Sequence, residues 1–149
     1  MRKQSAPSSP LLRNLAEFRF ELRQFLQFSE RAALQAGLQP QQHQLLLQVA
    51  GALEETKVTI AYAAGRLGLK HNSAVELVDR SEREGLIART VDISDKRRAI
   101  LRLTSKGERI LARLTGVHAR ELNELAPRLI TVLEHITTNA WSGTGTENK

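Results

Sequence analysis

The sequence predicts a mainly α-helical fold with one small β-hairpin, and three observations support this prediction. Apolar residues recur at helical spacing in long segments near both ends of the chain. Two shorter helical patterns lie in the middle and are joined by a tight turn. Two short segments that favour β-structure follow them, separated by a charged tip. A chain of 149 residues can bury the core of one domain but cannot hold a separate catalytic domain.

The central segment, residues 72–86, has the pattern of an amphipathic helix. Its inward face is predicted to consist of small and apolar side chains, namely Ala74, Leu77, Val78 and Ser81. Its outward side chains are charged, namely Glu76, Asp79, Arg80 and Arg83. Gly85 is placed to end the helix, because glycine readily adopts the left-handed conformation of a C-terminal cap.

A second helix is predicted directly upstream, over residues 60–67. Thr59 can cap its start, and residues 68–71 form a tight connection into the central helix. Two helices joined by so short a turn, the second of them amphipathic, predict a helix-turn-helix.

A β-hairpin is predicted downstream, formed by residues 86–91 and 98–103. In the second segment Ala99, Leu101 and Leu103 fall on one face, and Arg98 and Arg102 fall on the other, as on a strand with one buried face. The polar tip between the strands, residues 92–97, ends in a run of cations, namely Lys96, Arg97 and Arg98. A helix-turn-helix followed by a basic-tipped hairpin predicts a winged helix.

The N-terminal part is predicted to contain two helices. Residues 11–36 carry a wide apolar stripe, and Gly37 supplies the stop. Pro40 fits the first position of the next helix, where its missing N–H is not needed.

Two further helices are predicted after the hairpin. Thr104 or Ser105 is expected to begin the first of them, with Ser105 and Glu108 forming a capping box. Pro127 interrupts the pattern and is expected to open a last helix, with Leu129, Ile130, Leu133 and Ile136 facing inward. The first helix and the last two carry more apolar surface than one small domain needs, which indicates an interface.

The composition favours a polyanionic partner. Twenty-two Lys and Arg against sixteen Asp and Glu give a net charge of +6, which suits a nucleic acid or an acidic membrane surface. Residues 66–109 hold eleven of the basic and seven of the acidic side chains, so +4 of the excess lies in these 44 residues, around the predicted recognition helix and hairpin. The chain has no cysteine, which excludes disulfides and thiol redox sensing. No apolar run approaches a membrane span, so a cytoplasmic protein without membrane contact is expected.

The hairpin residues carry a family resemblance. Residues 92–98, followed by Leu103-Thr104 and Lys106-Gly107, resemble the wing signature of the MarR (multiple antibiotic resistance regulator) family. Residues 77–86 are similar to the end of that family's recognition helix. The resemblance implies a transcription regulator, a repressor whose terminal helices intertwine into a homodimer on pseudo-palindromic double-stranded DNA. It also implies a small aromatic or phenolic effector that releases the DNA.

The resemblance, together with the Ser- and Pro-rich start and the polar end of the sequence, gives the expected organisation of the chain. It divides into a disordered arm at 1–10, dimerisation helices at 11–37 and 104–140, a winged helix-turn-helix DNA-binding region at 38–103 and a disordered tail at 141–149. The last helix is shorter than is usual for the family, and Ser81 stands where family members carry a core leucine.

The start of the recognition helix supplies the first candidate DNA contacts, namely Lys70, His71, Asn72 and Ser73. Asn72 or Ser73 could instead cap the helix, a role that is compatible with DNA contact. Ser73 and Glu76 have the spacing of a capping box, and this interpretation is preferred for Glu76 because phosphates repel a carboxylate. Arg80 either reaches the DNA backbone or pairs with Asp79 or Glu84.

The wing supplies the second set of candidate contacts. By resemblance, Arg97 enters the minor groove, while Asp92 and Asp95 orient the tip. Physically, the planar cation of Arg97 suits a narrow and electronegative groove, and Lys96 and Arg98 add phosphate affinity. The competing interpretation is a salt-bridged hairpin tip.

No metal, cofactor or catalytic site is expected. None of the four histidines forms the i, i+3 or i, i+4 pair that a helical metal site favours. By resemblance, His43 and His118 lie at positions similar to two ligands of a zinc-responsive branch of the family, but Leu114 replaces another ligand. A metal-responsive regulator, an architectural or non-specific DNA-binding protein and a protein-interaction module therefore remain as alternatives. No nucleophile with a base, phosphate-binding glycine loop or carboxylate pair is present, so an enzyme is not expected.

Overall fold

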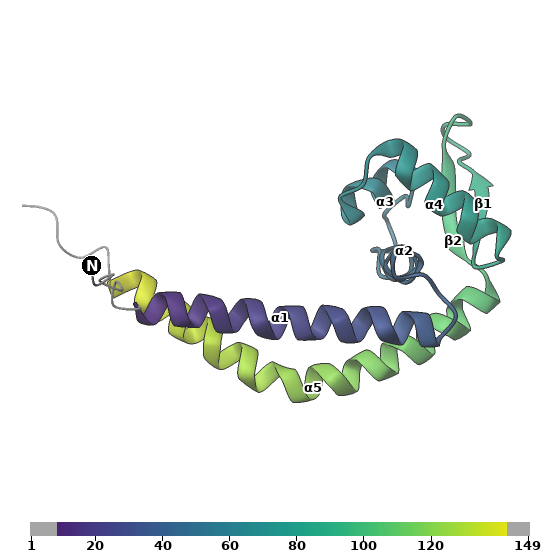
Figure 1. Cartoon of the computed structure of the whole chain (residues 1–149). Coiled ribbons are helices and arrows are strands. Elements are labelled where there is room, and N and C mark those ends of the chain that lie inside the picture. The colour runs from purple at the N-terminus through teal and green to yellow at the C-terminus, as the bar shows by residue number, and fades with distance from the viewer. Residues whose placement is uncertain (1–8, 143–149) are drawn as a thin grey trace, which may run out of the picture. The chain divides into compact units, whose positions relative to one another are not determined.

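The computed structural model describes residues 9–142, with side chains described as far as residue 138. Along these residues it has the order α1 (Pro10–Gln35), α2 (Pro40–Ala50), α3 (Ile60–Leu67), α4 (His71–Arg83), β1 (Ile87–Val91), β2 (Ala99–Leu103) and α5 (Ser105–Ser142) (Figure 1). The prediction of a mainly helical fold with one hairpin is confirmed. Most of the expected disordered arm and tail lies outside the described residues. Pro10 already belongs to α1, and α5 continues to Ser142.

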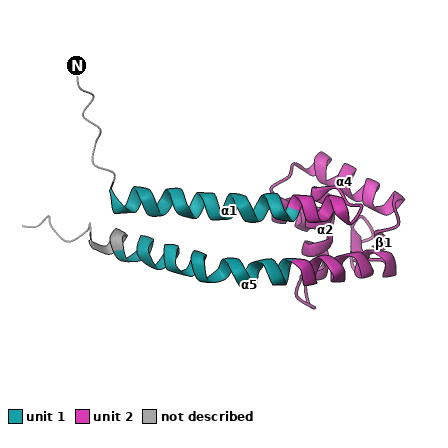
Figure 2. Ribbon diagram, turned by 60° about the horizontal axis from the view of Figure 1, so that its bottom comes forward, with its two compact units in different colours: residues 1–29, 118–149 teal, residues 30–117 magenta. Residues whose placement is uncertain are grey.

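The chain forms two compact units (Figure 2). One comprises residues 30–117 and contains the helix-turn-helix and the hairpin. The other comprises residues 1–29 and 118–149, in which the described parts of α1 and α5 run alongside each other. Both long helices contribute residues to both units.

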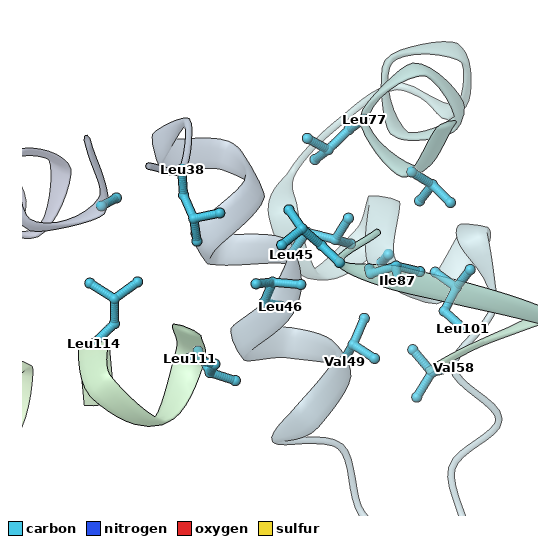
Figure 3. Close-up of a cluster of buried hydrophobic side chains, with 14 of the residues drawn as sticks. Leu38, Leu45, Leu46, Val49, Val58, Leu77, Ile87, Leu101, Leu111 and Leu114 are labelled. Carbon is cyan, nitrogen blue, oxygen red and sulfur yellow. The ribbon is translucent and has the colours of Figure 1, made fainter. Parts of the chain in front are cut away.

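The unit of residues 30–117 has a continuous apolar core (Figure 3). Leu45 and Leu46 of α2 lie at its centre and are fully buried. Apolar side chains from the surrounding elements pack around them, including Leu38, Leu77, Val78, Ile87, Leu101, Leu111 and Leu114. Full burial of one such side chain stabilises the fold by about 2 kcal/mol, so this core fixes α4 and the hairpin on a common support.

The helix ends follow the local sequence. The Thr59 hydroxyl accepts a hydrogen bond from the Tyr62 N–H at 3.1 Å, which confirms Thr59 as the N-cap of α3. The stops predicted at Gly37 and Gly85 are also confirmed, because α1 ends at Gln35 and α4 at Arg83. Gly85 has φ of 72°, the left-handed conformation that turns the chain from α4 into β1.

The hairpin is antiparallel, with Ile87 opposite Leu103 and Val91 opposite Ala99. The Leu101 N–H donates to the Val58 carbonyl at 2.8 Å, so the segment before α3 lies along the outer edge of β2. Leu101 is buried, while Arg102 beside it is exposed. The alternation predicted for the second strand is therefore confirmed.

The junction between β2 and α5 departs from the prediction. The expected capping box of Ser105 and Glu108 is wrong, because the Thr104 hydroxyl occupies the cap and accepts from the Gly107 N–H at 3.1 Å. The same hydroxyl donates to the Gly85 carbonyl. Gly107 is buried against Leu86, in the turn between α4 and β1. A Cβ placed on Gly107 would lie 2.3 Å from the Leu86 carbonyl oxygen. Only glycine permits this close approach of α5 to the start of β1.

The C-terminal helix is continuous through Pro127, so the expected break and separate last helix are wrong (Figure 1). Leu125 and Val132 are buried, and Leu129 and Ile136 are half-buried, at spacings of three and four residues. This apolar stripe runs past the proline, and its packing outweighs the lost backbone hydrogen bond. In this continuous helix, Ile130 and Leu133 lie away from the buried stripe and are exposed, contrary to the inward position expected for them.

The unit of residues 1–29 and 118–149 is held by polar as well as apolar contacts. Glu21 is buried and accepts from Arg128 Nε at 3.2 Å. His118 Nε2 lies 2.8 Å from the Ser29 hydroxyl, and the imidazole meets the Phe25 and Phe28 rings edge-on. Large apolar side chains remain exposed on this unit, namely Leu12, Leu15, Phe20, Leu26, Leu122, Ile130 and Leu133.

Candidate nucleic-acid interface

The first turn of α4 presents its side chains to solvent. Lys70 is the N-cap residue, and His71, Asn72 and Ser73 form the first three helical positions. All four are exposed, and none of their side chains hydrogen-bonds or ion-pairs within the part of the chain that the structure describes. The free N–H groups of a helix start point in the same direction, so this turn can donate to phosphates and base edges together.

Two capping predictions for α4 are wrong. Asn72 and Ser73 do not cap the helix, because it begins at His71 and its N-cap makes no side-chain hydrogen bond. Ser73 and Glu76 consequently do not form a capping box, and Glu76 is an exposed residue within the helix. The exposed helix start leaves its N–H groups accessible to water, so no side-chain cap is required.

Arg80 lies about two helical turns beyond Ser73 and is exposed. The carboxylates that could have paired with it are engaged elsewhere. Asp79 accepts a hydrogen bond from the guanidinium of Arg89 in β1, and Arg89 Nε also donates to Glu82 at 3.1 Å. The bond to Asp79 raises the pKa of Arg89 above its ordinary value. Glu84 accepts from Gln42 Nε2 at 2.8 Å. Arg80 is therefore available to an external anion.

Asp92 organises the base of the wing tip. Its side chain is 4% exposed and accepts from Lys57 Nζ at 3.0 Å and from an Arg98 guanidinium N–H at 3.1 Å. The Ser94 N–H and hydroxyl donate to the same carboxylate at 3.0 and 2.9 Å. The bond from Lys57, followed by that from the Ser94 backbone, holds the pKa of Asp92 far below its ordinary range. A charged Asp92 thus ties both strands of the tip to the segment before α3.

Asp95 organises the turn itself. It accepts from the backbone N–H and the Nε of Arg97, both at 3.1 Å, and lies 3.8 Å from Arg98 Nε. The hydrogen bonds from Arg97 lower the pKa of Asp95. The side chain of Arg97 is nevertheless 91% exposed, and Lys96 beside it is exposed too. The tip is salt-bridged and still presents its cations outward.

Lys57 was missed by the sequence interpretation. It lies 35 residues before Asp92 and meets that carboxylate and the Ser94 hydroxyl only because Val58 extends the edge of β2. The available signal was a lysine directly before a β-branched residue and the Thr59 cap. That signal is weak, because an exposed lysine before a helix is ordinary.

The two histidines considered as metal ligands lie in different settings. His43 is buried in the unit of residues 30–117, whereas His118 belongs to the other unit and contacts Ser29. Among residues 9–138, no group of three or more His, Asp or Glu side chains is placed to hold a metal ion. Nor is any helix in the described part long and apolar enough to cross a membrane.

Two hollows lie in the unit of residues 30–117. The smaller, of about 290 Å³, is lined by Ala32, Gln35, Ala36, Arg113, Leu114 and Val117. The larger, of about 610 Å³, lies between residues 54–57 and the hairpin. The smaller is mainly apolar with a single cationic side chain, which suits an organic acid.

A helix-turn-helix with an exposed basic helix start and a wing with an exposed basic tip define a winged-helix DNA-binding protein. Residues 36–98, from the end of α1 to the wing tip, match the family model described as MarR family. This match covers the helix-turn-helix and most of the wing, so the winged-helix region of the chain is similar to MarR family regulators, as its wing residues indicated.

Solved structures agree in fold. A MarR family protein from Bacillus stearothermophilus is 22% identical, with a TM-score of 0.70 over 95% of this chain and 100% of that one. A MepR variant from S. aureus, bound to an oligodeoxyribonucleotide, is 21% identical, with a TM-score of 0.62 over 85% and 94%. CouR from Rhodococcus jostii, bound to p-coumaroyl-CoA, is 23% identical, with a TM-score of 0.63 over 85% and 87%.

Proposed function

We propose that this protein is a homodimeric, ligand-responsive repressor that binds pseudo-palindromic operator DNA in the cytoplasm. The observation that carries the proposal is the pairing, in one compact unit, of an unpartnered polar helix start with a basic wing tip fixed by two carboxylates. Similarity in fold to a MepR variant bound to an oligodeoxyribonucleotide supports it.

In this proposal the two surfaces have different tasks. The first turn of α4 enters the major groove, where Lys70, His71, Asn72 and Ser73 contact base edges and phosphates. The wing lies over the adjacent minor groove with Arg97 inserted and with Lys96 and Arg98 near phosphates. Arg80, about two helical turns further along α4, reaches the DNA backbone.

The dimer is proposed from the apolar surface of residues 1–29 and 118–149. Exposed leucine, isoleucine and phenylalanine side chains on both α1 and α5 would be costly in water and are typical of an obligate interface. A twofold dimer would place two α4 helices about one DNA turn apart, which explains why a pseudo-palindromic site is expected.

The effector is proposed to be a small aromatic or phenolic acid, bound in the hollow beside Arg113. Its volume of about 290 Å³ fits a single ring, and the guanidinium can pair with a carboxylate. Binding would favour dimers whose two α4 helices no longer match the half-site spacing. Arg113→Ala should abolish the response to such an acid while leaving DNA affinity unchanged, which a titration of the acid against the DNA complex would measure.

An architectural or non-specific DNA-binding role is the second candidate. Exposed Glu76 favours it, because a carboxylate on the outer face of α4 opposes close approach to phosphates. The two roles differ in the ratio of specific to non-specific affinity, and in whether binding survives at physiological salt.

The test is a competition footprint on the DNA flanking the protein's own coding region at physiological salt. A discrete protected inverted repeat would support the regulator. Diffuse coverage that salt abolishes would favour the architectural role, and absence of any binding would leave only a protein-interaction module.

A further inference from the structure

Ile93 lies at the tip of the wing with its side chain in solvent. It is 98% exposed, and Val91, two residues earlier, is 65% exposed. We propose that Ile93 is the apolar DNA contact of the wing, packing against deoxyribose and base edges in the minor groove beside Arg97. This inference rests on the proposed function and adds a specificity-determining residue to it.

The backbone on both sides of Ile93 is fixed by hydrogen bonds. The Asp92 N–H donates to the Arg98 carbonyl at 3.0 Å, and the Ser94 N–H and hydroxyl donate to the Asp92 carboxylate. Asp92 and Ser94 are thereby turned towards Lys57, and Ile93 between them is left pointing away. The exposed isoleucine is held in place and loses little freedom when it becomes buried against a partner.

The charge around Ile93 selects the partner. Lys96, Arg97 and Arg98 lie on the same tip, so an apolar protein surface would have to bury three neighbouring cations. A DNA minor groove satisfies both chemistries at once, since its phosphates attract the cations and its sugar walls are apolar. The guanine amino group protrudes into this groove, so a branched apolar side chain there favours A·T pairs.

The test compares salt-dependent affinity for the duplex that the footprint defines. The proteins are wild type, Ile93→Ala, Arg97→Ala and the control Leu53→Ala, which removes a leucine that is 69% exposed outside the wing. We expect Ile93→Ala to bind about tenfold more weakly at every salt concentration, because burial of apolar surface does not depend on counterions. Arg97→Ala should instead reduce the slope of log affinity against log salt by about 1. Leu53→Ala should match wild type.

Two further measurements complete the test. Ile93→Val should retain most of the wild-type affinity, and Ile93→Ala should show less preference for A·T over G·C beside the half-sites. Thermal unfolding of Ile93→Ala should match wild type, because the side chain makes almost no contact within the fold.

The inference is wrong if Ile93→Ala binds like wild type while Arg97→Ala binds more weakly, an outcome that leaves the proposed function standing. It is also wrong if Ile93→Ala lowers the salt slope as Arg97→Ala does, because Ile93 would then act by placing the cations. Lack of specific binding by wild type would overturn the proposed function itself.

Discussion

The two proposed DNA-contacting surfaces, the wing tip and the first turn of α4, are built on opposite principles. In the wing, Asp92 and Asp95 bind the surrounding cations and backbone N–H groups, so its shape is set before DNA arrives. At the start of α4, the polar side chains make no bonds within the described residues. A tip that is already ordered suits the minor groove, where few base contacts distinguish one sequence from another. Side chains that are free before binding suit the recognition of bases in the major groove.

The largest effect should come from the junction that supports both surfaces. Gly107→Ala forces a Cβ to within 2.3 Å of the Leu86 carbonyl oxygen, so α5, β1 or both must shift. We expect the free energy of unfolding to fall by about 3 kcal/mol, the scale of overpacking in a core. Gly116→Ala is the matched control, because a Cβ there meets nothing within 4 Å. It should stabilise α5 by about 0.5 kcal/mol. Denaturant unfolding of both variants checks this, and equal values would refute it.

The next effect concerns the fixed geometry of the wing. Asp92→Asn removes the charge that holds Lys57 and Arg98, so the tip should lose its fixed shape. Specific DNA affinity should then fall by roughly 30-fold, because the tip would have to become ordered when it binds. Hydrogen exchange of the Ser94 and Arg98 N–H groups should rise in the free protein. Unchanged exchange in the variant would contradict a role for Asp92 in ordering the tip.

The same carboxylate gives a pH dependence. Because the folded protein lowers the pKa of Asp92, its contribution to stability is complete well above the ordinary value of 3.8 and declines as the pH falls through that value and below. Thermal unfolding between neutral and acid pH should therefore show a loss in wild type that is smaller in Asp92→Asn.

A smaller effect is expected when the charge of Arg97 is removed and the fold of the wing tip is left intact. Arg97→Ala should weaken binding about tenfold at physiological salt and reduce A·T preference beside the half-sites, while dimerisation is unchanged. Affinity measured on duplexes with A·T and G·C flanks, together with sedimentation, checks this. Wild-type affinity in the variant would show that the wing assignment is wrong.

The smallest effect on total affinity is expected at the start of α4. Asn72→Ala should reduce affinity for the operator about fivefold and relax the preference at one base pair. Non-specific binding should stay unchanged, because the variant loses a base contact but keeps every phosphate contact. Competition with single base-pair variants of the operator measures the relaxation. A uniform loss on every sequence would instead place Asn72 at a phosphate.

Sequence reasoning predicted what depends on local chemistry. The helix stops at Gly37 and Gly85, the Thr59 cap and the basic wing tip follow from single residues and their neighbours. It misjudged Asn72 and Ser73, whose strong capping propensity is not used, and Pro127, which the packing around Leu125 and Val132 tolerates inside α5. These outcomes are decided by tertiary packing, which overrides local propensity.

The long-range parts of the site were beyond such reasoning for the same reason. The contact between Lys57 and Asp92 exists only because the chain brings residues separated by 35 positions to one sheet edge. Ser81 is a further case, because it is fully buried and its hydroxyl has no partner among the described residues. The sequence marked the position as unusual for the family, but its burial without a partner emerged only from the packed core.

The Lys57 contact has a consequence for how such a regulator can diverge. The placement of the wing depends on a side chain that lies before α3 and is not among the proposed DNA contacts. Exchange of that lysine for a shorter or neutral residue would shift the tip over the minor groove and leave every DNA-facing residue intact. Operator preference can therefore drift between relatives whose contact residues are identical, and comparison of those residues alone would misassign their targets.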